Sequence, residues 1–485
     1  MQNVSRRSFL FSGAAAVPFF IGGCATSSGP RRIAANAKVN VGIIGCGLIA
    51  KSTNVPGFLR DPRCRIVAVC DPVKLAPDYF YGGRNSNFGA EGFADAKGGY
   101  RRDVAGWQVV KDQVDKAYGN SDCRVVFDWR DIVDDPTIDA VAICTPDHWH
   151  AIMSIAAMKA GKHVFCQKPM SLSIREGQAM VRVAKETGVT FQVGNQCRND
   201  VNYRLPEELV FNGYLGKIKS ATISIPGGNH WEGHGYSPAR APLPGYFTPA
   251  TWDLWQGPAE HFEDNAYIPS IHEPTCWRFN RRYGNGMVTD FGAHEFDYLS
   301  RALGTDYSGP IAVENVTSDI AETPHPEIFS WANKYSFEFV YPNGLRVKVV
   351  NCCKEYPRQM VCHCEKGDVG IVNDKKFVPK AFESFKESDF KPSDRLFYRN
   401  PNGYDGEYWH EADFIDGIIR GVQCCSPCEV GHRTISMAHL ANAAIRLGVS
   451  KLGWDPKTET FVGPHAAEAE ALQTVKYCNG WELGA

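Results

Sequence analysis

The chain has 485 residues, too many for one ordinary hydrophobic core, so we expect two domains. Hydrophobic residues make up 44% and charged residues 22% of the sequence, as is usual for globular proteins. The formal net charge of −2 argues against a nucleic acid as the main partner, and the sequence has no apolar run of the ~20 residues needed to span a bilayer.

The first 24 residues have the features of an export signal. Arg6 and Arg7 directly precede an apolar stretch of signal-peptide length. The pair resembles a twin-arginine address, and the sequence IGGC that ends at Cys24 resembles a lipobox, whose cysteine is acylated. We therefore expect a signal at residues 1–24, a polar tether at 25–37, and a periplasmic protein that touches the membrane only through a lipid anchor at Cys24. A fraying N-terminal helix is the alternative.

The seventeen cysteines predict packing rather than disulfides or metal binding. Cys46, Cys70, Cys144 and Cys166 occur singly in apolar strand patterns, where cysteine behaves as a small buried hydrophobe. Twin-arginine export moves proteins that have already folded in the reducing cytoplasm, so buried thiols can persist. The sequences VCHC and CCSPC lack partners at zinc spacing, and we expect no metal site.

A glycine turn follows the first strand pattern, KVNVGIIG. Gly45 permits a tight turn, Gly47 lets the backbone approach a pyrophosphate, and Ala50 allows close packing of helix on strand. The start of the helix supplies unpaired N–H groups for phosphates. The turn therefore predicts a dinucleotide site, although a strand–helix turn without a ligand could also use two glycines.

The second strand pattern, RIVAVCD, ends at Asp71, 24 residues after Gly47. A carboxylate at this position accepts ribose hydroxyl protons and repels a 2′-phosphate, so we predict NAD rather than NADP. The alternative is an aspartate that only caps the start of a loop.

Strand and helix patterns then alternate up to residue 197 and predict an α/β fold with a doubly wound parallel sheet. Residues 81–102 have no period and are interpreted as a loop at the active site or an interface. Ligands bind beyond the carboxyl ends of such strands, where several polar residues fall. The predicted cofactor contacts are Gly45, Gly47, Leu48, Ile49, Asp71, Thr145, Pro146, His148, Gln167, Lys168, Asn195 and Gln196.

The sequence resembles the Gfo/Idh/MocA oxidoreductases, which include glucose–fructose oxidoreductase and inositol dehydrogenase. The resemblance covers everything after residue 38 and rests on the segments GIIGCGLIA, TPDHWH, QKPMSLSIREG, GNQCR, GNGMVTDFGAHEFD and GHRTISMAHLANAAIRLG. It implies an NAD-binding Rossmann domain at residues 38–197, a substrate-binding α+β domain at 198–485 whose C-terminal helices partly pack back, and a homodimer or homotetramer. The family usually has Glu-Lys-Pro where this chain has Gln167-Lys168-Pro169.

The resemblance also implies a catalytic set of Lys168, Asp290 and His294. The ammonium of Lys168 would stabilise a developing alkoxide. His294 is the predicted general base, because the unperturbed pKa of histidine lies near working pH, and Asp290 would orient the substrate or the imidazole. If a helix starts here, the spacing of four residues places Asp290 and His294 on one face. The alternatives are a solvated lysine and a capping aspartate beside a packed histidine.

Alternating strand patterns from residue 216 predict an open, mostly antiparallel sheet, with a hairpin turn at residues 342–344. Residues 228–283 contain four tryptophans and seven prolines without a period and predict a lid or binding loop. Its rings would stack on sugar faces, or equally would anchor the loop or a subunit contact. The predicted substrate contacts are Lys168, Arg198, Trp231, Trp277, Asp290 and His294.

These assignments imply hydride transfer between NAD and a secondary hydroxyl of a sugar, glycoside or polyol. Little free NAD exists outside the cytoplasm, so an exported enzyme would retain its nucleotide and restore the nucleotide's redox state in each turnover. The alternative function is a redox-neutral NAD-dependent glycosidase that works through a 3-keto intermediate. A third hypothesis is a non-catalytic sugar-binding lipoprotein on the same scaffold.

Overall fold

A computed structural model describes residues 38–81, 101–227, 237–272, 276–323, 325–396 and 409–484. The predicted signal at 1–24, the tether at 25–37, the lipidation site Cys24 and the predicted sugar-stacking Trp231 lie outside the described residues. Within the described ranges, no helix combines the length and the apolar character needed to cross a membrane.

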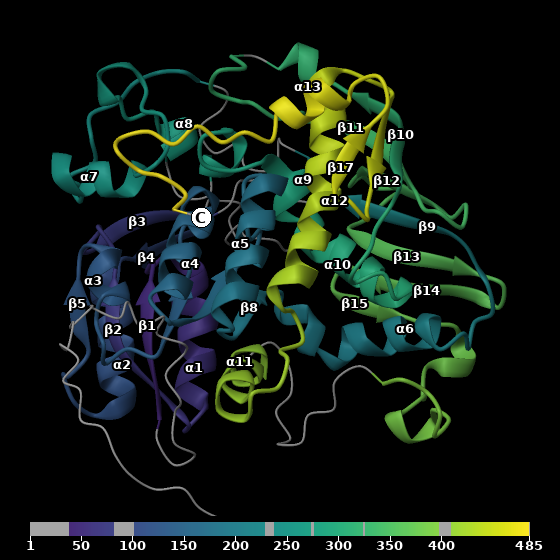
Figure 1. The fold of residues 1–485 in the computed structure, drawn as a ribbon, viewed down its shortest axis with the longest axis horizontal. Coiled ribbons are helices and arrows are strands. Elements are labelled where there is room, and N and C mark those ends of the chain that lie inside the picture. The colour runs from purple at the N-terminus through teal and green to yellow at the C-terminus, as the bar shows by residue number, and fades with distance from the viewer. Residues whose placement is uncertain are drawn as a thin grey trace, which may run out of the picture.

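The first half of the chain builds a six-stranded parallel sheet in the order β5-β2-β1-β6-β7-β8 (Figure 1). This order reverses direction between β1 and β6, which places a ligand crevice beyond the carboxyl ends of these two strands. The predicted doubly wound fold is therefore confirmed. The strands are β1 Val39–Ile44, β2 Cys64–Cys70, β5 Arg124–Val126, β6 Ala140–Ile143, β7 His163–Gln167 and β8 Phe191–Gly194.

Helices cover both faces of this sheet (Figure 1). The first begins as a π turn, η1, and continues as α1; the wider turn precedes Pro56, which has no N–H for a regular α-helical bond. The ends of the predicted 81–102 loop are strands, β3 and β4, which pair antiparallel. These elements are η1 Ala50–Asn54, α1 Val55–Arg60, β3 Ala76–Tyr81, β4 Arg101–Ala105, α2 Trp107–Tyr118, α3 Trp129–Val133, η2 Asp147–Trp149, α4 His150–Lys159 and α5 Ile174–Thr187.

The second half builds a nine-stranded sheet in the order β15-β14-β13-β9-β12-β11-β10-β16-β17. β9 and β12 pair parallel and the other neighbours pair antiparallel, as predicted. Gly344, with φ of 82°, turns the hairpin between β11 and β12. The strands are β9 Ile218–Ile225, β10 Ala312–Ser318, β11 Tyr335–Val340, β12 Arg346–Asn351, β13 Gln359–Cys364, β14 Gly367–Val372, β15 Lys375–Phe377, β16 Lys451–Asp455 and β17 Thr460–Val462.

The segment predicted to be a loop at 228–283 contains short helices where it is described. α7 starts at a capping box, in which the Thr248 side chain accepts from Thr251 N, with Pro249 at its first position. Helices this short have too few turns to show a period in the sequence. The helices of this half are η3 Gln196–Asn199, α6 Val201–Phe211, α7 Pro249–Gln256, η5 Glu263–Asn265, α8 Pro269–His272, η6 Cys276–Phe279, α9 Gly286–Asp290, α10 Gly292–Leu303, η7 Ile320–Glu322, η8 Lys380–Phe382, η9 Glu387–Asp389, α11 Trp409–Arg420, α12 Cys428–Leu447 and α13 Ala466–Ala471.

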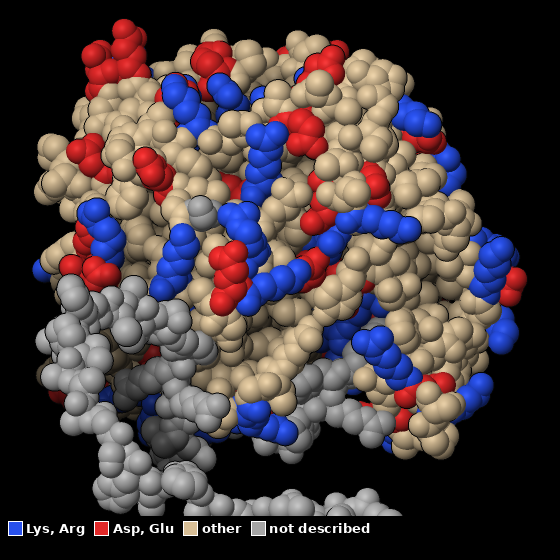
Figure 2. All heavy atoms as spheres, viewed as in Figure 1, with Lys and Arg blue, Asp and Glu red and all other residues tan. Residues whose placement is uncertain are grey.

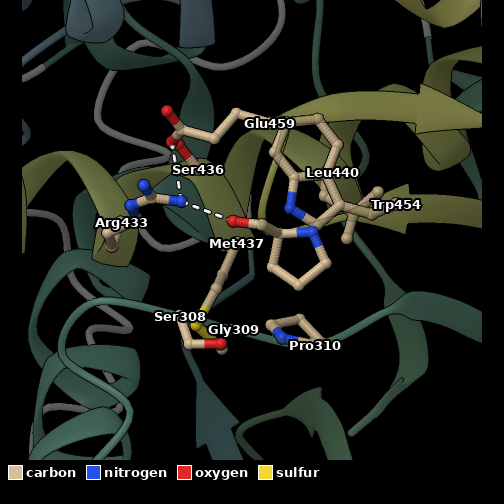
Figure 3. Close-up of a pocket in the computed structure, with 10 residues that line it drawn as sticks. Ser308, Gly309, Pro310, Arg433, Ser436, Met437, Leu440, Trp454 and Glu459 are labelled. Carbon is tan, nitrogen blue, oxygen red and sulfur yellow. Dashed lines mark hydrogen bonds and ion pairs between the residues drawn. The ribbon is translucent and has the colours of Figure 1, made fainter. Parts of the chain in front are cut away.

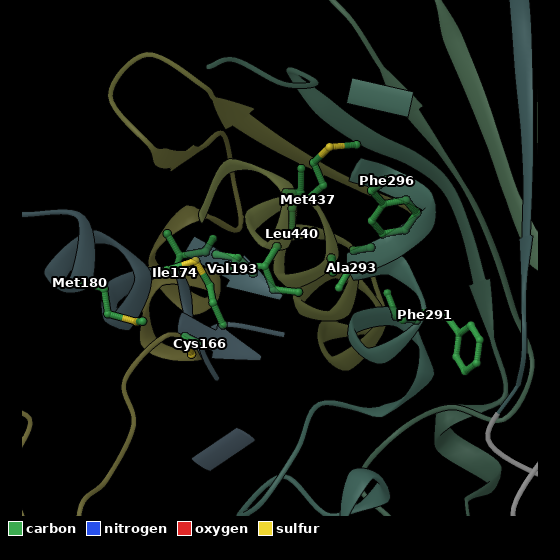
Figure 4. Packing of buried hydrophobic residues seen from close by; sticks show 14 of the residues in the cluster. Cys166, Ile174, Met180, Val193, Phe291, Ala293, Phe296, Met437 and Leu440 are labelled. Carbon is green, nitrogen blue, oxygen red and sulfur yellow. The ribbon is translucent and has the colours of Figure 1, made fainter. Parts of the chain in front are cut away.

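One hydrophobic cluster joins the two sheets. Figure 4 shows Phe296 of α10 and Leu440 of α12 in the same packed region as Cys166 of β7 and Val193 of β8. The sixteen described cysteines are all free, and Cys46, Cys70, Cys144 and Cys166 are buried, which agrees with the predicted packing role. The helices α10 and α12 therefore tie the second half of the chain to the parallel sheet.

The last residues, 472–484, form a C-terminal strap that returns to the first half of the chain (Figure 1, yellow). The ring of Trp481 lies 4.9 Å from that of Trp149 and 5.8 Å from that of Trp129. Asn479 Nδ2 donates to Gly257 O over 2.8 Å, and Tyr477 Oη donates to Glu176 Oε1 over 2.6 Å. The strap thus fastens the segment after α7 to the helices of the parallel sheet.

Charges of both signs are mixed on the molecular face in Figure 2. On the nine-stranded sheet, for example, Arg346 lies 2.9 Å from Glu314 and 2.7 Å from Glu338. Exposed pairs of this kind contribute about 0–1 kcal/mol each, so these surface charges have little influence on the fold.

We predict that Trp481→Ala lowers the free energy of unfolding by about 2 kcal/mol, because the half-buried ring loses its contacts with Trp129 and Trp149. Chemical denaturation measures the change. Phe377→Ala is the control, because Phe377 is 47% exposed on β15. Equal losses in the two variants would show that the strap does not stabilise the fold.

Candidate active site

The glycine turn lies at the carboxyl end of β1, as the sequence predicts. Gly45 has φ of 90°, and a Cβ there would lie 2.8 Å from the backbone of Cys144 and Thr145. Only glycine therefore lets the turn pack against the end of β6. Gly47, Leu48 and Ile49 are partly exposed at the start of the helix, so their backbone is accessible to a phosphate group.

Asp71 closes the other side of this turn. Its Oδ2 accepts from Cys46 N over 2.7 Å, and its Oδ1 accepts from Val73 N over 2.8 Å. Burial raises the pKa of Asp71 to about 6, although both hydrogen bonds favour the carboxylate. Each carboxylate oxygen can accept a second bond, so the predicted ribose contact is compatible with this arrangement and stays a prediction.

Polar atoms without partners collect at the ends of the next strands. Thr145 Oγ1 follows β6, and Asn195 Oδ1 and Gln196 Nε2 follow β8; all three atoms are buried and have no hydrogen-bond partner among the described residues. Buried polar groups are usually satisfied, so these atoms fit a polar ligand at this edge of the sheet.

Lys168 joins the two halves of the chain at the same edge. Its Nζ lies 3.0 Å from both the backbone oxygen and Oδ1 of Asp290, the last residue of α9. Asp290 Oδ2 lies 3.1 Å from Arg278 Nε. The two cations hold the pKa of Asp290 well below its usual range despite burial. Asp290 is therefore an anion shared by Lys168 and Arg278.

His294 completes the predicted catalytic set. The predicted single helix is split at Phe291, so Asp290 ends α9 and His294 lies in the first turn of α10. Burial, followed by the charges of Lys168 and Arg358, holds the pKa of His294 well below its ordinary value, while Asp290 acts in the opposite direction. The imidazole is thus neutral at pH 7 and can accept a proton. Its Nδ1 is buried and has no partner in the described part of the chain.

Three charged residues of the site were missed from the sequence. Arg278 pairs with Asp290, and Arg358 pairs with Glu295 over 3.1 Å near His294. Burial, and then the charge of Asp290, raises the pKa of Asp147 well above its usual value, which favours the protonated carboxyl. Asp147 follows a predicted strand in TPDH, a signal that could have identified it. Neither arginine lies in a recognisable motif.

The side chain of Gln167 is buried beneath the site and does not line it. Its side chain is 3% exposed, and its Nε2 donates to Asn54 Oδ1 over 3.0 Å. The prediction that Gln167 contacts the cofactor directly is therefore wrong for the side chain. Beside it, the ring nitrogens of His150 lie 2.7 Å from Pro169 O and 2.9 Å from Thr145 O and connect the ends of β7 and β6.

His148 lies in a buried aromatic environment. Its ring is buried among Trp149, Trp255 and Tyr283, and Nε2 lies 3.2 Å from Trp255 O. Burial lowers the pKa of His148 to about 3. Its Nδ1 is buried and has no hydrogen-bond partner among the described residues, and the cofactor contact stays a prediction.

Arg198 is a structural residue. It pairs with Asp297 over 2.7 Å and with Asp306 over 2.8 Å, and its Nη1 donates to Cys425 O over 3.0 Å. Only 3% of its side chain is exposed. The prediction that Arg198 binds substrate is wrong, because its guanidinium is fully used in joining η3, α10 and the loop before α12.

The tryptophans of the 228–283 segment anchor it where they are described. Trp277 is 8% exposed, and the guanidinium of Arg278 lies 4.3 Å from its ring centre. Trp252 is 2% exposed and stacks on Trp255 with 5.2 Å between ring centres. These contacts favour the alternative of an anchoring role, and stacking of Trp277 on a sugar stays a prediction.

A pocket outside this site is shown in Figure 3. It lies between α12 and the β16–β17 hairpin, and Arg433 in it is already bound to Pro456 O over 2.6 Å and Glu459 over 3.2 Å. None of the predicted site residues lines it. The strand-end site is accordingly the candidate active site.

Residues 39–195 match the model of the GFO_IDH_MocA family, described as an oxidoreductase family with an NAD-binding Rossmann fold. A levoglucosan dehydrogenase from Pseudarthrobacter phenanthrenivorans is 39% identical over 187 residues, 38% of each chain. A 2,7-anhydro-N-acetylneuraminate hydratase from Escherichia coli is 37% identical over 103 residues, 21% of this chain and 26% of that protein. These matches span well under two thirds of the relatives' lengths.

The fold similarity extends much further than the sequence similarity. The structure of a levoglucosan dehydrogenase in complex with NADH and levoglucosan superposes with a TM-score of 0.55 at 18% identity, covering 86% of this chain and 99% of that one. An aldose–aldose oxidoreductase from Caulobacter crescentus gives a TM-score of 0.54 at 17% identity, covering 86% and 99%. Residues 39–195 thus match an NAD-binding Rossmann fold, and the fold of the chain resembles these structures over 86% of its length.

We predict that Asp71→Ser weakens NADH binding about tenfold or more, because a charged hydrogen-bond acceptor for ribose is lost. In the unmodified protein, the affinity for NADH should also fall as the pH drops below about 6. Asp71 becomes protonated there and no longer accepts hydrogen bonds through both of its oxygens. Fluorescence titration with NADH measures both effects. Asp112→Ser, an exposed change on α2, is the control. Unchanged affinity in Asp71→Ser would refute the ribose contact.

Proposed function

We propose that the protein is an NAD-dependent oxidoreductase that acts on a secondary hydroxyl of a sugar, glycoside or polyol and retains its nucleotide. The observation that carries the proposal is the gathering of Asp290, Arg278 and His294 around Lys168, which follows β7 in the parallel sheet that also carries the glycine turn. The similarity to a levoglucosan dehydrogenase supports the substrate class.

The residues at the strand ends fit an NAD molecule. The accessible turn at Gly47 would hold the pyrophosphate, Asp71 the adenosine ribose, and the unpartnered atoms of Thr145 and Asn195 the nicotinamide end. When bound, the oxidised nucleotide supplies an acceptor for the hydride of a carbinol carbon.

The side chains of the site would then handle the proton of the reacting hydroxyl. A ring nitrogen of the neutral His294 accepts this proton, and Lys168 Nζ donates a hydrogen bond to the oxygen as it becomes a carbonyl. Asp290 holds Lys168 and Arg278 in place through both carboxylate oxygens. A hydride and a proton thus leave the alcohol by separate routes.

A redox-neutral reaction is the second candidate. The similarity to an anhydro-sugar hydratase favours it, because a hydratase makes no net redox change. Asp147, whose pKa lies well above its usual value, would supply a protonated carboxyl for a leaving oxygen.

A panel of sugars, glycosides and polyols tests the proposal. Purified protein would be incubated with each compound, with nucleotide absorbance at 340 nm and product masses followed together. NADH formation with a keto-sugar product supports the oxidoreductase, whereas aglycone release at constant absorbance supports the redox-neutral alternative. Mass analysis of nucleotide released by denaturation tests retention. Absence of both reactions and of bound nucleotide would refute the proposal.

Lys168→Ala is expected to lower kcat by about 10³-fold, because the developing alkoxide loses its donor, while nucleotide stays bound. Steady-state kinetics and NADH titration measure the two effects. Lys451→Ala on β16 is the control, since its side chain is 66% exposed. Normal turnover in Lys168→Ala would remove the lysine from the mechanism.

We propose that the protein is exported by the twin-arginine route, held at the membrane through Cys24, and assembled as a homodimer or homotetramer. The free, buried cysteines are compatible with folding before export. Replacing Arg6 and Arg7 by lysine should retain the protein in the cytoplasm, and Cys24→Ala should release it into the soluble periplasmic fraction. Cell fractionation and native mass determination test these points; unchanged distribution would refute the export proposal.

A further inference from the structure

Three buried side chains form a hydrogen-bond chain below Lys168, which we call the amide relay. Gln167 Nε2 donates to Asn54 Oδ1 over 3.0 Å, and Asn54 Nδ2 donates to Glu411 Oε1 over 2.7 Å. The exposed fractions of the three residues are 3%, 0% and 0%. The relay connects the end of β7, the end of η1 and the helix α11, which belong to distant parts of the chain.

The carboxylate of Glu411 gives the relay a single direction. Asn54 Nδ2 donates to Glu411 Oε1, which is the order that an ionised carboxylate requires because it only accepts hydrogen bonds. The Oδ1 of Asn54 then faces Gln167, which must present its own Nε2. This leaves Gln167 Oε1 to accept from the backbone N–H of Lys168 over 3.3 Å. A carboxylate at residue 167 would meet an acceptor instead of a donor.

The surrounding backbone is shaped to this arrangement. A Cβ at Gly57 in α1 would lie 2.5 Å from Glu411 Oε2, and a Cβ at Gly194 would lie 2.8 Å from the Gln167 amide. Both glycines thus leave the space that the two ends of the relay occupy. Cys144 Sγ, at the end of β6, also donates to Asn54 Oδ1 over 3.3 Å.

We propose that the amide relay positions Lys168 and keeps a buried negative charge at residue 411, two hydrogen bonds away from Gln167, instead of at residue 167 beside Lys168. This proposal rests on the proposed function, because the relay would act through the lysine and the nucleotide next to it. A carboxylate adjacent to Lys168 would stabilise the positively charged oxidised nicotinamide relative to the neutral reduced one. Gln167, Asn54 and Glu411 are therefore positioning residues that limit the preference for the oxidised over the reduced nucleotide.

Reversal of the relay provides the test. Q167E sets a carboxylate against Asn54 Oδ1 and leaves a mismatch, whereas E411Q keeps an amide oxygen that can accept from Asn54 Nδ2 and leaves none. The double variant Q167E/E411Q restores one donor and one acceptor once the Asn54 amide rotates by 180°. Q167E should lower the melting temperature by about 4 °C, and the double variant should recover most of this loss. A double variant as unstable as Q167E would overturn the relay.

The affinities for NAD⁺ and NADH separate a functional role from a purely structural one. In the double variant the charge lies beside Lys168, so NAD⁺ affinity should rise severalfold relative to NADH affinity while stability is normal. Recovery of stability with an unchanged affinity ratio would overturn the charge-setting role and leave only a structural one.

Gln192→Glu is the matched control, because Gln192 is another fully buried glutamine of the parallel sheet, whose Nε2 donates to His410 O over 2.6 Å. E411Q should restore the melting temperature of Q167E and should not restore that of Q192E. Equal recovery in both would overturn the specific link between Gln167 and Glu411. If the unmodified protein binds neither nucleotide, the proposed function fails and the charge-setting role with it, while the melting temperatures still decide whether the relay exists.

Discussion

The ion pair between Lys168 and Asp290 is the contact on which the candidate site depends. Lys168 follows a strand of the parallel sheet, and Asp290 ends a helix of the second half, so the pair forms only when the two halves are docked. Since Asp290 also holds Arg278, one buried carboxylate fixes two cations near the proposed reaction centre. Burial and the charge of Lys168 lower the pKa of His294, while the charge of Asp290 acts in the opposite direction, so the ion pair also influences the proposed base.

Because the site forms only when the two halves are docked, several contacts outside the site are needed to hold the halves together. Phe296 and Leu440 pack in one cluster with strands of the parallel sheet. The C-terminal strap adds Trp481 against Trp149 and the Asn479 bond to the segment after α7. These contacts lie outside the site, yet they restrain the elements that carry its residues. Catalytic groups drawn from distant segments need such support, because errors of about 1 Å in position can cost large factors in rate.

Several buried charged side chains are stabilised by an ion pair or a hydrogen bond. Arg198 is neutralised by Asp297 and Asp306, and Glu411 is bonded to the amide of Asn54. Burying a charge without a partner costs several kcal/mol, so these side chains can be buried only because their partners are present. The same rule makes the unpartnered atoms of Thr145 and Asn195 meaningful, since they are the groups that a bound nucleotide would satisfy.

The sequence by itself determined the parallel sheet, the glycine turn at Gly45 and the catalytic candidates Lys168, Asp290 and His294, because turn chemistry and strand periodicity are local properties of the chain. Only the tertiary structure decided that Arg198 and His148 are enclosed, that Trp277 lies under Arg278, and that Arg278 and Arg358 belong to the site. Those outcomes depend on which elements pack over a side chain. Burial and charge pairing arise between residues far apart in the chain, and no local pattern records them.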